Sequence, residues 1–246
     1  MFFAPVLLAA LLVGLQPLGA EQPIKTIGII SAVGDKLEIS NIGLMVFANS
    51  HNTIDIHDWN LGREMTDAFK SALSTRFDVH VIADDAPEFE SANGTSFDFA
   101  AAVRARLKPN DPVSYDAYLV IRSDTRQDII GGTNQSLSGI GLYRHHGVDS
   151  EPYVFTACTV TLVDGHTFKA LADTWMALPR EEGVAGFFST LSRYGDYDFF
   201  AGVAEQAWPA SDTSFDPEQK MSLEASFTYL LDREVPFTVQ RLGLAN

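Results

Sequence analysis

Hydrophobic and polar residues alternate over a long central stretch, residues 151–175, and this alternation predicts two extended β-strands. The first predicted strand covers residues 153–163, and the second covers residues 167–175. Asp164-Gly165 lies between them, and this dipeptide is typical of a two-residue type I′ turn, in which the backbone takes positive φ angles. The stretch therefore predicts a long antiparallel β-hairpin.

Strands and helices alternate before this hairpin. Residues 26–31 are almost continuously apolar, which is typical of a strand buried on both faces, and with residues 37–47 they predict an N-terminal hairpin. Residues 60–75 place apolar side chains at three- and four-residue spacings, which predicts a helix that Asp58 or Asn60 can cap. Further predicted elements are an edge strand or ordered loop at 49–58, strands at 77–82 and 115–122, and a helix at 97–107 capped by Ser96. This order predicts an α/β (α+β) fold, with helices flanking a mixed sheet.

The second half of the chain adds one strand before the hairpin and a helical segment after it. Residues 124–136 predict a surface loop, and residues 137–145 predict the strand that enters the hairpin. Predicted helices follow at 181–194, 198–206 and 217–231; Asp216 and Pro217 begin the last one, Pro236 ends it, and an apolar tail at 235–244 docks on the sheet. We expect one α/β domain over residues 21–246, with a core at 24–176 and a C-terminal helical extension at 177–246.

The first twenty residues have a different pattern from the rest. A short apolar run is followed by the small-residue ending Leu18-Gly19-Ala20, which predicts a secretory signal peptide cleaved after Ala20. The alternative is an uncleaved membrane anchor, but the apolar run is short for a span and Pro17 interrupts it. We therefore expect a periplasmic or secreted protein with no stable membrane span after cleavage.

Charge and cysteine content narrow the class of protein further. The formal net charge of −15 repels phosphate backbones, which argues against nucleic acid as a partner. The chain has a single cysteine, Cys158, which cannot form an intramolecular disulfide and whose place in a strand favours a buried, inert thiol. A secreted chain with a core large enough to need no disulfides fits a bacterial envelope protein.

The predicted order of elements, with strand 115–122 followed by further strands and by the sequence Thr161-Leu162-Val163-Asp164-Gly165, resembles small α/β domains of bacterial envelope proteins. These include the N-terminal domain of the Tol translocation β-propeller protein, the curli secretion-channel subunit, and lipoprotein activators of penicillin-binding proteins. The resemblance covers residues 24–175 and rests on topology and composition. It implies a domain that binds partners and performs no chemistry, and it assigns no functional residue. Unlike the lipoproteins, the chain has no cysteine after the predicted cleavage site.

Motifs for nucleotide binding or serine hydrolysis are missing, so no cofactor is predicted. The best candidate metal ligands are His51, Asp55 and His57, which share one face if residues 51–57 are extended. In that arrangement Asp55 and His57 are near enough to bind one metal ion, His51 is too far to join easily, and a third ligand must come from elsewhere. The alternative is the solvated face of an amphipathic strand.

The aromatic segment 194–200 is the second candidate site. Its aromatic residues are Tyr194, Tyr197, Phe199 and Phe200. These side chains either pack against the sheet or form a rim that binds a partner. The sequence thus favours a non-enzymatic envelope protein that binds a protein or glycan partner. The alternative is a metal-assisted hydrolase that uses Asp55 and His57 with a distant third ligand.

Overall fold

The structure is a computed structural model, and it describes residues 23–43, 49–91, 98–107, 114–127, 136–146, 149–179, 197–198, 200–209 and 214–245. The strands are β1 (Thr26–Ala32), β2 (Lys36–Ile42), β3 (Ser50–Asp55), β4 (Asp78–Ala83), β5 (Ala117–Ser123), β6 (Thr125–Gln127), β7 (Ser136–His145), β8 (Asp149–Asp164), β9 (Ala170–Trp175), β10 (Leu178–Pro179), β11 (Tyr197–Asp198) and β12 (Phe200–Gly202). The helices are α1 (Leu61–Leu73), α2 (Phe99–Arg106) and α3 (Pro217–Arg241), with short 3₁₀ turns η2 (His57–Trp59), η3 (Pro87–Ser91) and η5 (Glu205–Ala207). This mixed sheet with flanking helices confirms the predicted α/β fold.

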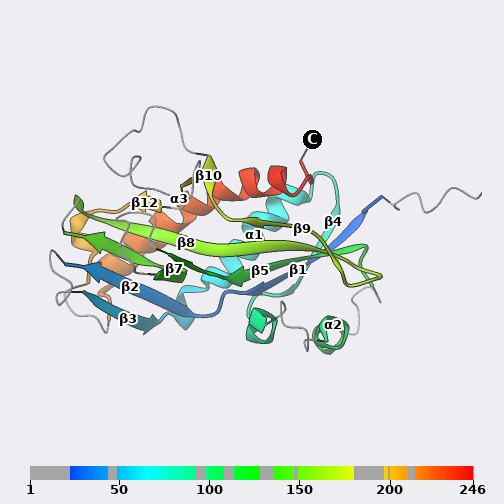
Figure 1. Cartoon of the computed structure of the whole chain (residues 1–246), viewed down its shortest axis with the longest axis horizontal. Helices are drawn as coiled ribbons and strands as arrows, with labels where there is room; N and C mark the ends of the chain where they lie inside the picture. The colour runs from blue at the N-terminus through cyan, green and yellow to red at the C-terminus, as the bar shows by residue number, and fades with distance from the viewer. Residues whose placement is uncertain are drawn as a thin grey trace, which may run out of the picture.

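Strand β8 joins the two halves of one ten-stranded sheet. It is 16 residues long. Its first part pairs with β7 and β12, and its second part pairs with β5 and β9. One half of the sheet therefore has the order β3-β2-β7-β8-β12, and the other has the order β4-β1-β5-β8-β9, with β8 common to both (Figure 1).

The predicted N-terminal hairpin is wrong, because β1 and β2 belong to different halves of the sheet. Strand β1 pairs in parallel with β4 and β5, whereas β2 pairs in parallel with β7 and antiparallel with β3. Only residues 33–35 separate β1 from β2, and the two strands follow each other along the sheet (Figure 1). The apolar character of β1 fits this position, since strands in the parallel part of a sheet are usually covered on both faces.

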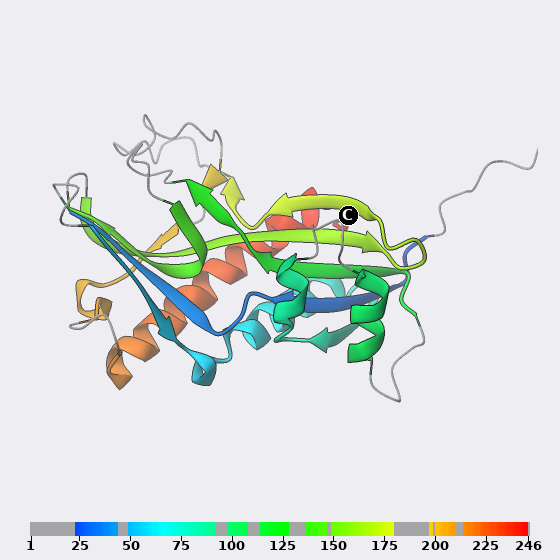
Figure 2. The same ribbon diagram turned by 60° about the horizontal axis from the view of Figure 1, so that its bottom comes forward.

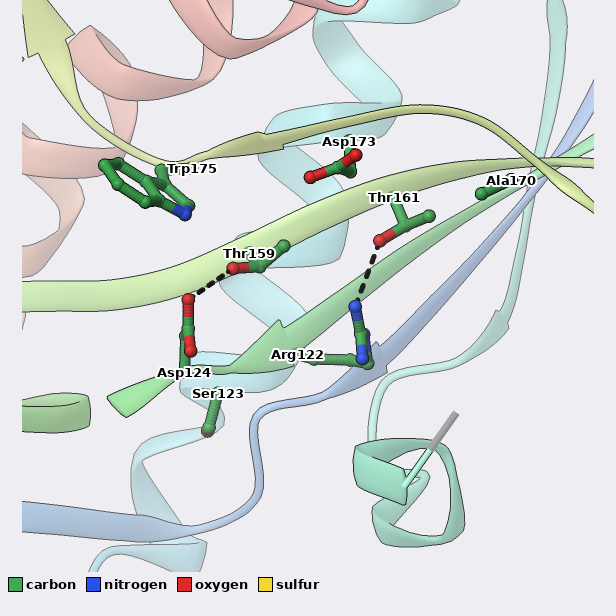
Figure 3. A pocket seen from close by; sticks show the side chains of 8 residues that line it. All are labelled: Arg122, Ser123, Asp124, Thr159, Thr161, Ala170, Asp173 and Trp175. Carbon is green, nitrogen blue, oxygen red and sulfur yellow. Dashed lines mark hydrogen bonds between the residues drawn. The ribbon is translucent and has the colours of Figure 1, made fainter. Parts of the chain in front are cut away.

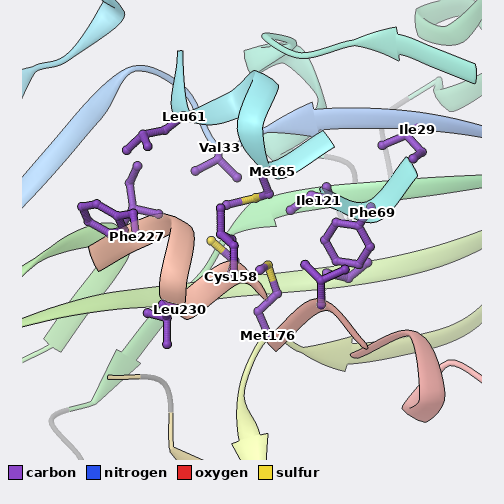
Figure 4. Close-up of a cluster of buried hydrophobic side chains, with 14 of the residues drawn as sticks. Ile29, Val33, Leu61, Met65, Phe69, Ile121, Cys158, Met176, Phe227 and Leu230 are labelled. Atoms are coloured by element: carbon purple, nitrogen blue, oxygen red, sulfur yellow. The ribbon is translucent and has the colours of Figure 1, made fainter. Parts of the chain in front are cut away.

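The larger hydrophobic core lies between one face of the sheet and helices α1 and α3. These helices lie next to each other along that face (Figures 1 and 2). In Figure 4, Met65 and Phe69 of α1 and Phe227 and Leu230 of α3 surround buried strand residues. Cys158 is one of these, fully buried, as its place in the alternating strand predicts. Phe69 belongs to the buried face of α1 together with the predicted apolar residues. Helix α3, at the C-terminal end, also packs into this main core.

The opposite face of the sheet is covered unevenly. Helix α2 and the turn η3 cover one end, where Phe89 and Val103 pack on Tyr118 and Val120 of β5. A second apolar cluster lies at the other end of this face, around Tyr143, Phe155 and neighbouring residues. Between the two clusters the sheet carries polar side chains instead, on β5, β8 and β9.

The hairpin of β8 and β9 is confirmed, but its predicted two-residue turn and the strand start at Thr167 are wrong. Five residues, 165–169, separate the two strands. Asp164 Oδ1 accepts the backbone N–H groups of His166 and Thr167, and the positive φ angle, 56°, falls on Phe168. Gly165 is required for another reason, since a Cβ there would collide with the carbonyl oxygen of Tyr115. The hydrogen bonds to the Asp164 side chain thus stabilise a five-residue loop in place of the predicted type I′ turn.

Helix α3 extends well beyond its predicted end. It begins as predicted, with Asp216 as the N-cap and Pro217 in the first turn, but it continues through Pro236 to Arg241. Pro236 is exposed, while Val235 and Val239 on either side of it are buried. Packing of these side chains on the sheet offsets the cost of the proline, which is about 3 kcal/mol in an isolated helix. The predicted apolar tail at 235–244 is therefore largely helical, and its buried side chains belong to the main core as expected: Val235, Val239, Leu242 and Leu244.

Three further expectations about helices need correction. The predicted helix at 198–206 is wrong, because residues 200–202 form the strand β12 and residues 205–207 form the turn η5. Asp98 rather than Ser96 caps α2, accepting from Ala101 N, and Asn60 at the N-cap of α1 makes no side-chain capping bond.

Ser96 and the predicted helix at 181–194 lie outside the described residues, as does the predicted signal peptide. No helix in the described part of the chain has the length and apolar character needed to cross a membrane.

Candidate functional site

The three predicted metal ligands lie on an exposed edge of the sheet, at and just after β3. His51 Nδ1 lies 2.9 Å from Ser40 Oγ of the neighbouring strand β2. His57 is not on the strand, because β3 ends at Asp55 and the turn η2 begins at His57. The turn brings the His57 ring back toward Asp55, so that Nδ1 lies 2.9 Å from Asp55 Oδ1, with both side chains 76% exposed.

Asp55 and His57 therefore form a local ion pair. The hydrogen bond to Asp55 raises the pKa of His57. The backbone N–H of His57, followed by its side chain, lowers the pKa of Asp55. No cluster of three or more His, Cys, Asp or Glu side chains that could hold a metal ion occurs among the described residues. The hydrolase alternative thus has no third ligand within the part of the chain that the structure describes.

The aromatic candidates are only partly described. Tyr194 and Phe199 lie outside the described residues, and Tyr197 belongs to β11, whose backbone pairs with β10. Phe200 is half-buried, and its ring packs against Tyr143, Tyr153 and Phe155 at centroid distances of 5.9–6.2 Å. This side chain packs on the sheet rather than standing out as a rim.

A polar groove on the sheet is a further candidate site in the described part of the chain. It has a volume of about 340 Å³ and lies on the face that α2 covers only at one end. Figure 3 shows the side chains that line it. The groove is lined by residues of β5, β8, β9 and the segment after β5: Arg122, Ser123, Asp124, Thr159, Thr161, Ala170, Asp173 and Trp175. Small-molecule sites have volumes in this range and carry a few well-placed polar groups.

Strand register brings these side chains together. Arg122 of β5 pairs with Thr159 of β8, which in turn pairs with Trp175 of β9. Thr161 pairs with Asp173 in the next row on the same face. Side chains two residues apart along a strand point to the same face, so both rows point into the groove.

Arg122 is the central group of the site. The residue is only 5% exposed, and its Nη2 donates a hydrogen bond of 3.1 Å to Thr161 Oγ1, which orients the guanidinium across the groove (Figure 3). Its Nε is buried and has no hydrogen-bond partner among the residues that the structure describes. Burial lowers the pKa of the guanidinium, and the negative charges of Asp124 and Asp173 counteract part of this effect. An arginine nevertheless stays charged in a protein, so the groove contains a buried cation with a free donor.

The two aspartates differ in their roles. Asp124 Oδ2 accepts from Thr159 Oγ1 over 2.8 Å, and its Oδ1 accepts from Thr125 N over 2.8 Å, so this carboxylate holds the end of β5 against β8. Asp173 is exposed, and its carboxylate forms no hydrogen bond with any described residue. Trp175 is half-buried at the end of the groove. The site thus offers a donor, an acceptor and an indole ring to a ligand.

Comparisons with known proteins add little to this picture. No protein-family model matches the chain, and no curated protein matches it. Among solved structures, the chain is similar to a Xanthomonas campestris protein described by the family model DUF330, with a TM-score of 0.37 and 11% identity. The similarity covers 93% of this chain and 90% of the other. Neither a common fold nor a common function follows from a similarity this low.

The sequence contained a signal for this groove that its periodicity alone does not reveal. Residues 117–121 are apolar enough for a central strand, and Arg122 follows them directly within the same buried strand. A charge in that position needs a partner or a function. Thr159 and Thr161 lie two residues apart on β8, so they point to the same face. Their position beside Asp173 is set by the register of the hairpin, and the wrongly predicted turn did not give this register.

Proposed function

We propose that the protein is a periplasmic or secreted binding protein of the bacterial envelope, which acts by contact with a partner that enters the groove around Arg122. One observation carries the binding site: Arg122, a residue only 5% exposed, lines an open groove, and its Nε donor has no partner among the described residues. A buried donor without a partner costs about 1–3 kcal/mol. A ligand atom that accepts this hydrogen bond recovers that cost, so the free protein is built to gain from binding.

The composition of the groove supports recognition rather than a reaction. Its lining contains no histidine, cysteine or lysine, which are common bases and nucleophiles. The envelope location rests on the predicted signal peptide at residues 1–20, and the partner-binding role also agrees with the resemblance to envelope domains. A protein or a glycan remains the expected class of partner.

Photo-crosslinking inside cells tests the role of the groove. A photoreactive phenylalanine derivative replaces Ala170 at the exposed rim of the groove, and the same residue replaces the exposed Ala225 on α3 as the matched control. We expect irradiation of bacteria that produce the full chain to give a covalent adduct at position 170 and none at 225. Absence of an adduct at 170, or equal labelling at both positions, would reject the groove as a contact site.

Cell fractionation tests the location separately. We expect osmotic shock of the same bacteria to release a mature protein that begins at Glu21, as mass spectrometry would show. An intact Met1 on protein retained in the cytoplasm would reject the envelope role.

A further inference from the structure

The charges of the groove restrict the chemistry of its ligand. One cation, Arg122, is accompanied by two carboxylates, Asp124 and Asp173, and both lie near enough to act on the guanidinium. The lining therefore has a net charge of −1, and the whole chain has a formal net charge of −15. A phosphate or a simple carboxylate is therefore repelled both by the lining and by the whole chain, even though Arg122 can pair with it.

The hydrogen-bonding groups require a ligand that both accepts and donates. Arg122 Nε is a donor in need of an acceptor, whereas the Asp173 carboxylate only accepts. Thr161 Oγ1 accepts a hydrogen bond from Arg122, and Thr159 Oγ1 donates one to Asp124. Each threonine hydroxyl therefore already positions one of the charged side chains. Hydroxyl groups on the ligand satisfy both requirements, because each can accept from Arg122 or donate to Asp173.

Trp175 adds an apolar surface beside these polar groups. It lies on the same face as Arg122 and Thr159, in the same row of the strand register, and is half-buried at one end of the groove. An indole ring contributes a large, rigid contact area at low cost in side-chain entropy. A pyranose ring has a C–H face for such a surface and hydroxyls around its edge.

We propose that the groove binds a neutral saccharide, with one sugar ring against Trp175, a hydroxyl oxygen accepting from Arg122 Nε, and a hydroxyl donating to Asp173. This inference rests on the proposed binding function and names the class of ligand for the same groove. A volume of about 340 Å³ has room for one or two sugar rings. Neutral sugar avoids the repulsion that an anion meets, and its hydroxyl groups can pair with both Arg122 Nε and the Asp173 carboxylate.

Isothermal titration calorimetry of the mature chain tests the inference with defined probes. The saccharides are maltose, cellobiose and N,N′-diacetylchitobiose, and the probes of other classes are alanyl-alanine and inorganic phosphate. We expect at least one disaccharide to bind with one site per chain and to change the fluorescence of Trp175, while phosphate does not bind. The Trp175→Phe variant should lose that fluorescence change, which identifies the ring in contact.

Two variants and one control locate the binding. Asp173→Asn removes the exposed acceptor charge without disturbing any hydrogen bond between described residues, and Arg122→Lys keeps the charge but removes Nε. We expect each to weaken disaccharide binding roughly tenfold or more, the effect of losing one hydrogen bond to a charged group. Asp232→Asn, on the exposed face of α3, should bind like the wild type.

Several results would overturn the saccharide while leaving the binding function in place. Binding of alanyl-alanine or phosphate with the same sensitivity to Asp173→Asn, and no binding of the three disaccharides, would show that the groove recognises charge. Failure of all five probes together with a protein adduct at position 170 would make the ligand a protein surface. Disaccharide binding that neither variant weakens would place the sugar elsewhere. Failure of the photo-crosslinking at position 170, by contrast, rejects the proposed function itself.

Discussion

Thr156 of β8 and Glu234 of α3 meet inside the protein, where the threonine hydroxyl Oγ1 donates a hydrogen bond of 2.6 Å to Glu234 Oε2. Both residues are completely buried. The bond joins the strand common to both halves of the sheet with the longest helix. A carboxyl group so far from solvent depends strongly on its hydrogen-bond partners, because a buried polar group left unpaired is costly.

We therefore expect Thr156→Val to destabilise the protein by about 1–3 kcal/mol, since valine keeps the shape of threonine but cannot donate to the buried carboxyl oxygen of Glu234. Chemical denaturation of the variant and the wild type measures the difference. Thr228→Val is the matched control, because Thr228 also donates to a glutamate, Glu64, but is exposed. Its effect should stay within about 0.5 kcal/mol. Equal effects at the two positions would mean that burial of the pair is unimportant.

The close approach of Gly165 to the carbonyl of Tyr115 leads to a second prediction. Gly165→Ala places a Cβ against this backbone oxygen, so either the hairpin loop or the segment before β5 must move. We expect a loss of about 1–3 kcal/mol, as for other overpacked sites. Gly202→Ala serves as the control, because a Cβ at that position meets no atom of the described residues within 4 Å. Thermal melting curves that coincide for the two alanine variants would contradict the predicted collision.

The ion pair of His57 and Asp55 predicts a change in titration behaviour. The pKa of His57 in the folded protein should lie above the ordinary value of 6.5, because Asp55 stabilises the protonated ring. Stability from this shift is fully present below the unfolded pKa of histidine and is lost as the pH rises through the higher folded pKa. Asp55, whose pKa is lowered, contributes stability above its unfolded pKa that is lost as the pH falls through the folded one.

An NMR titration of the imidazole protons measures this directly. In Asp55→Asn the pKa of His57 should fall toward its ordinary value. Asp67→Asn, on the exposed side of α1, should leave it unchanged. The same experiment with zinc tests the metal alternative, since line broadening of both His57 and His51 by substoichiometric metal would favour a ligand role.

Pro236 offers a test of the length of α3. The proline has no N–H, and it is exposed in the middle of a helix whose buried face continues on both sides. We expect Pro236→Ala to stabilise the protein by about 1–3 kcal/mol, because alanine restores the helical hydrogen bond and removes the ring. Pro217→Ala at the first turn should change stability little, since no helical donor is missing there. Destabilisation by Pro236→Ala would indicate that docking of the last turns requires the proline geometry.

The sequence predicted the types of most elements because their signals are local. The apolar stripe of α1, the alternation of β8 and the cap at Asp216 each depend on neighbouring residues, and the structure confirms them. The errors lie where distant residues decide. Pairing of β1 with β4 and β5 depends on strands that come later in the chain, and the extension of α3 past Pro236 depends on packing against the sheet.

The candidate site was missed for the same reason. Arg122, Thr161 and Asp173 come from three strands, and Asp173 lies 51 positions after Arg122 in the sequence. Sequence patterns favoured His51, Asp55 and His57 because they are close along the chain, yet the turn at His57 joins only two of them. A buried arginine following an apolar strand was the one local sign of the groove.

The place of β8 in both halves of the sheet has a consequence for how the protein opens. Neither half can separate from the other without breaking hydrogen bonds along this strand, so the described core should unfold as one cooperative unit. Amide protons of residues 153–163 should then exchange with solvent only in global unfolding events, more slowly than those of the edge strands β3 and β4. The pairing of β8 with strands distant in sequence also raises the contact order, which is typical of a chain that folds slowly.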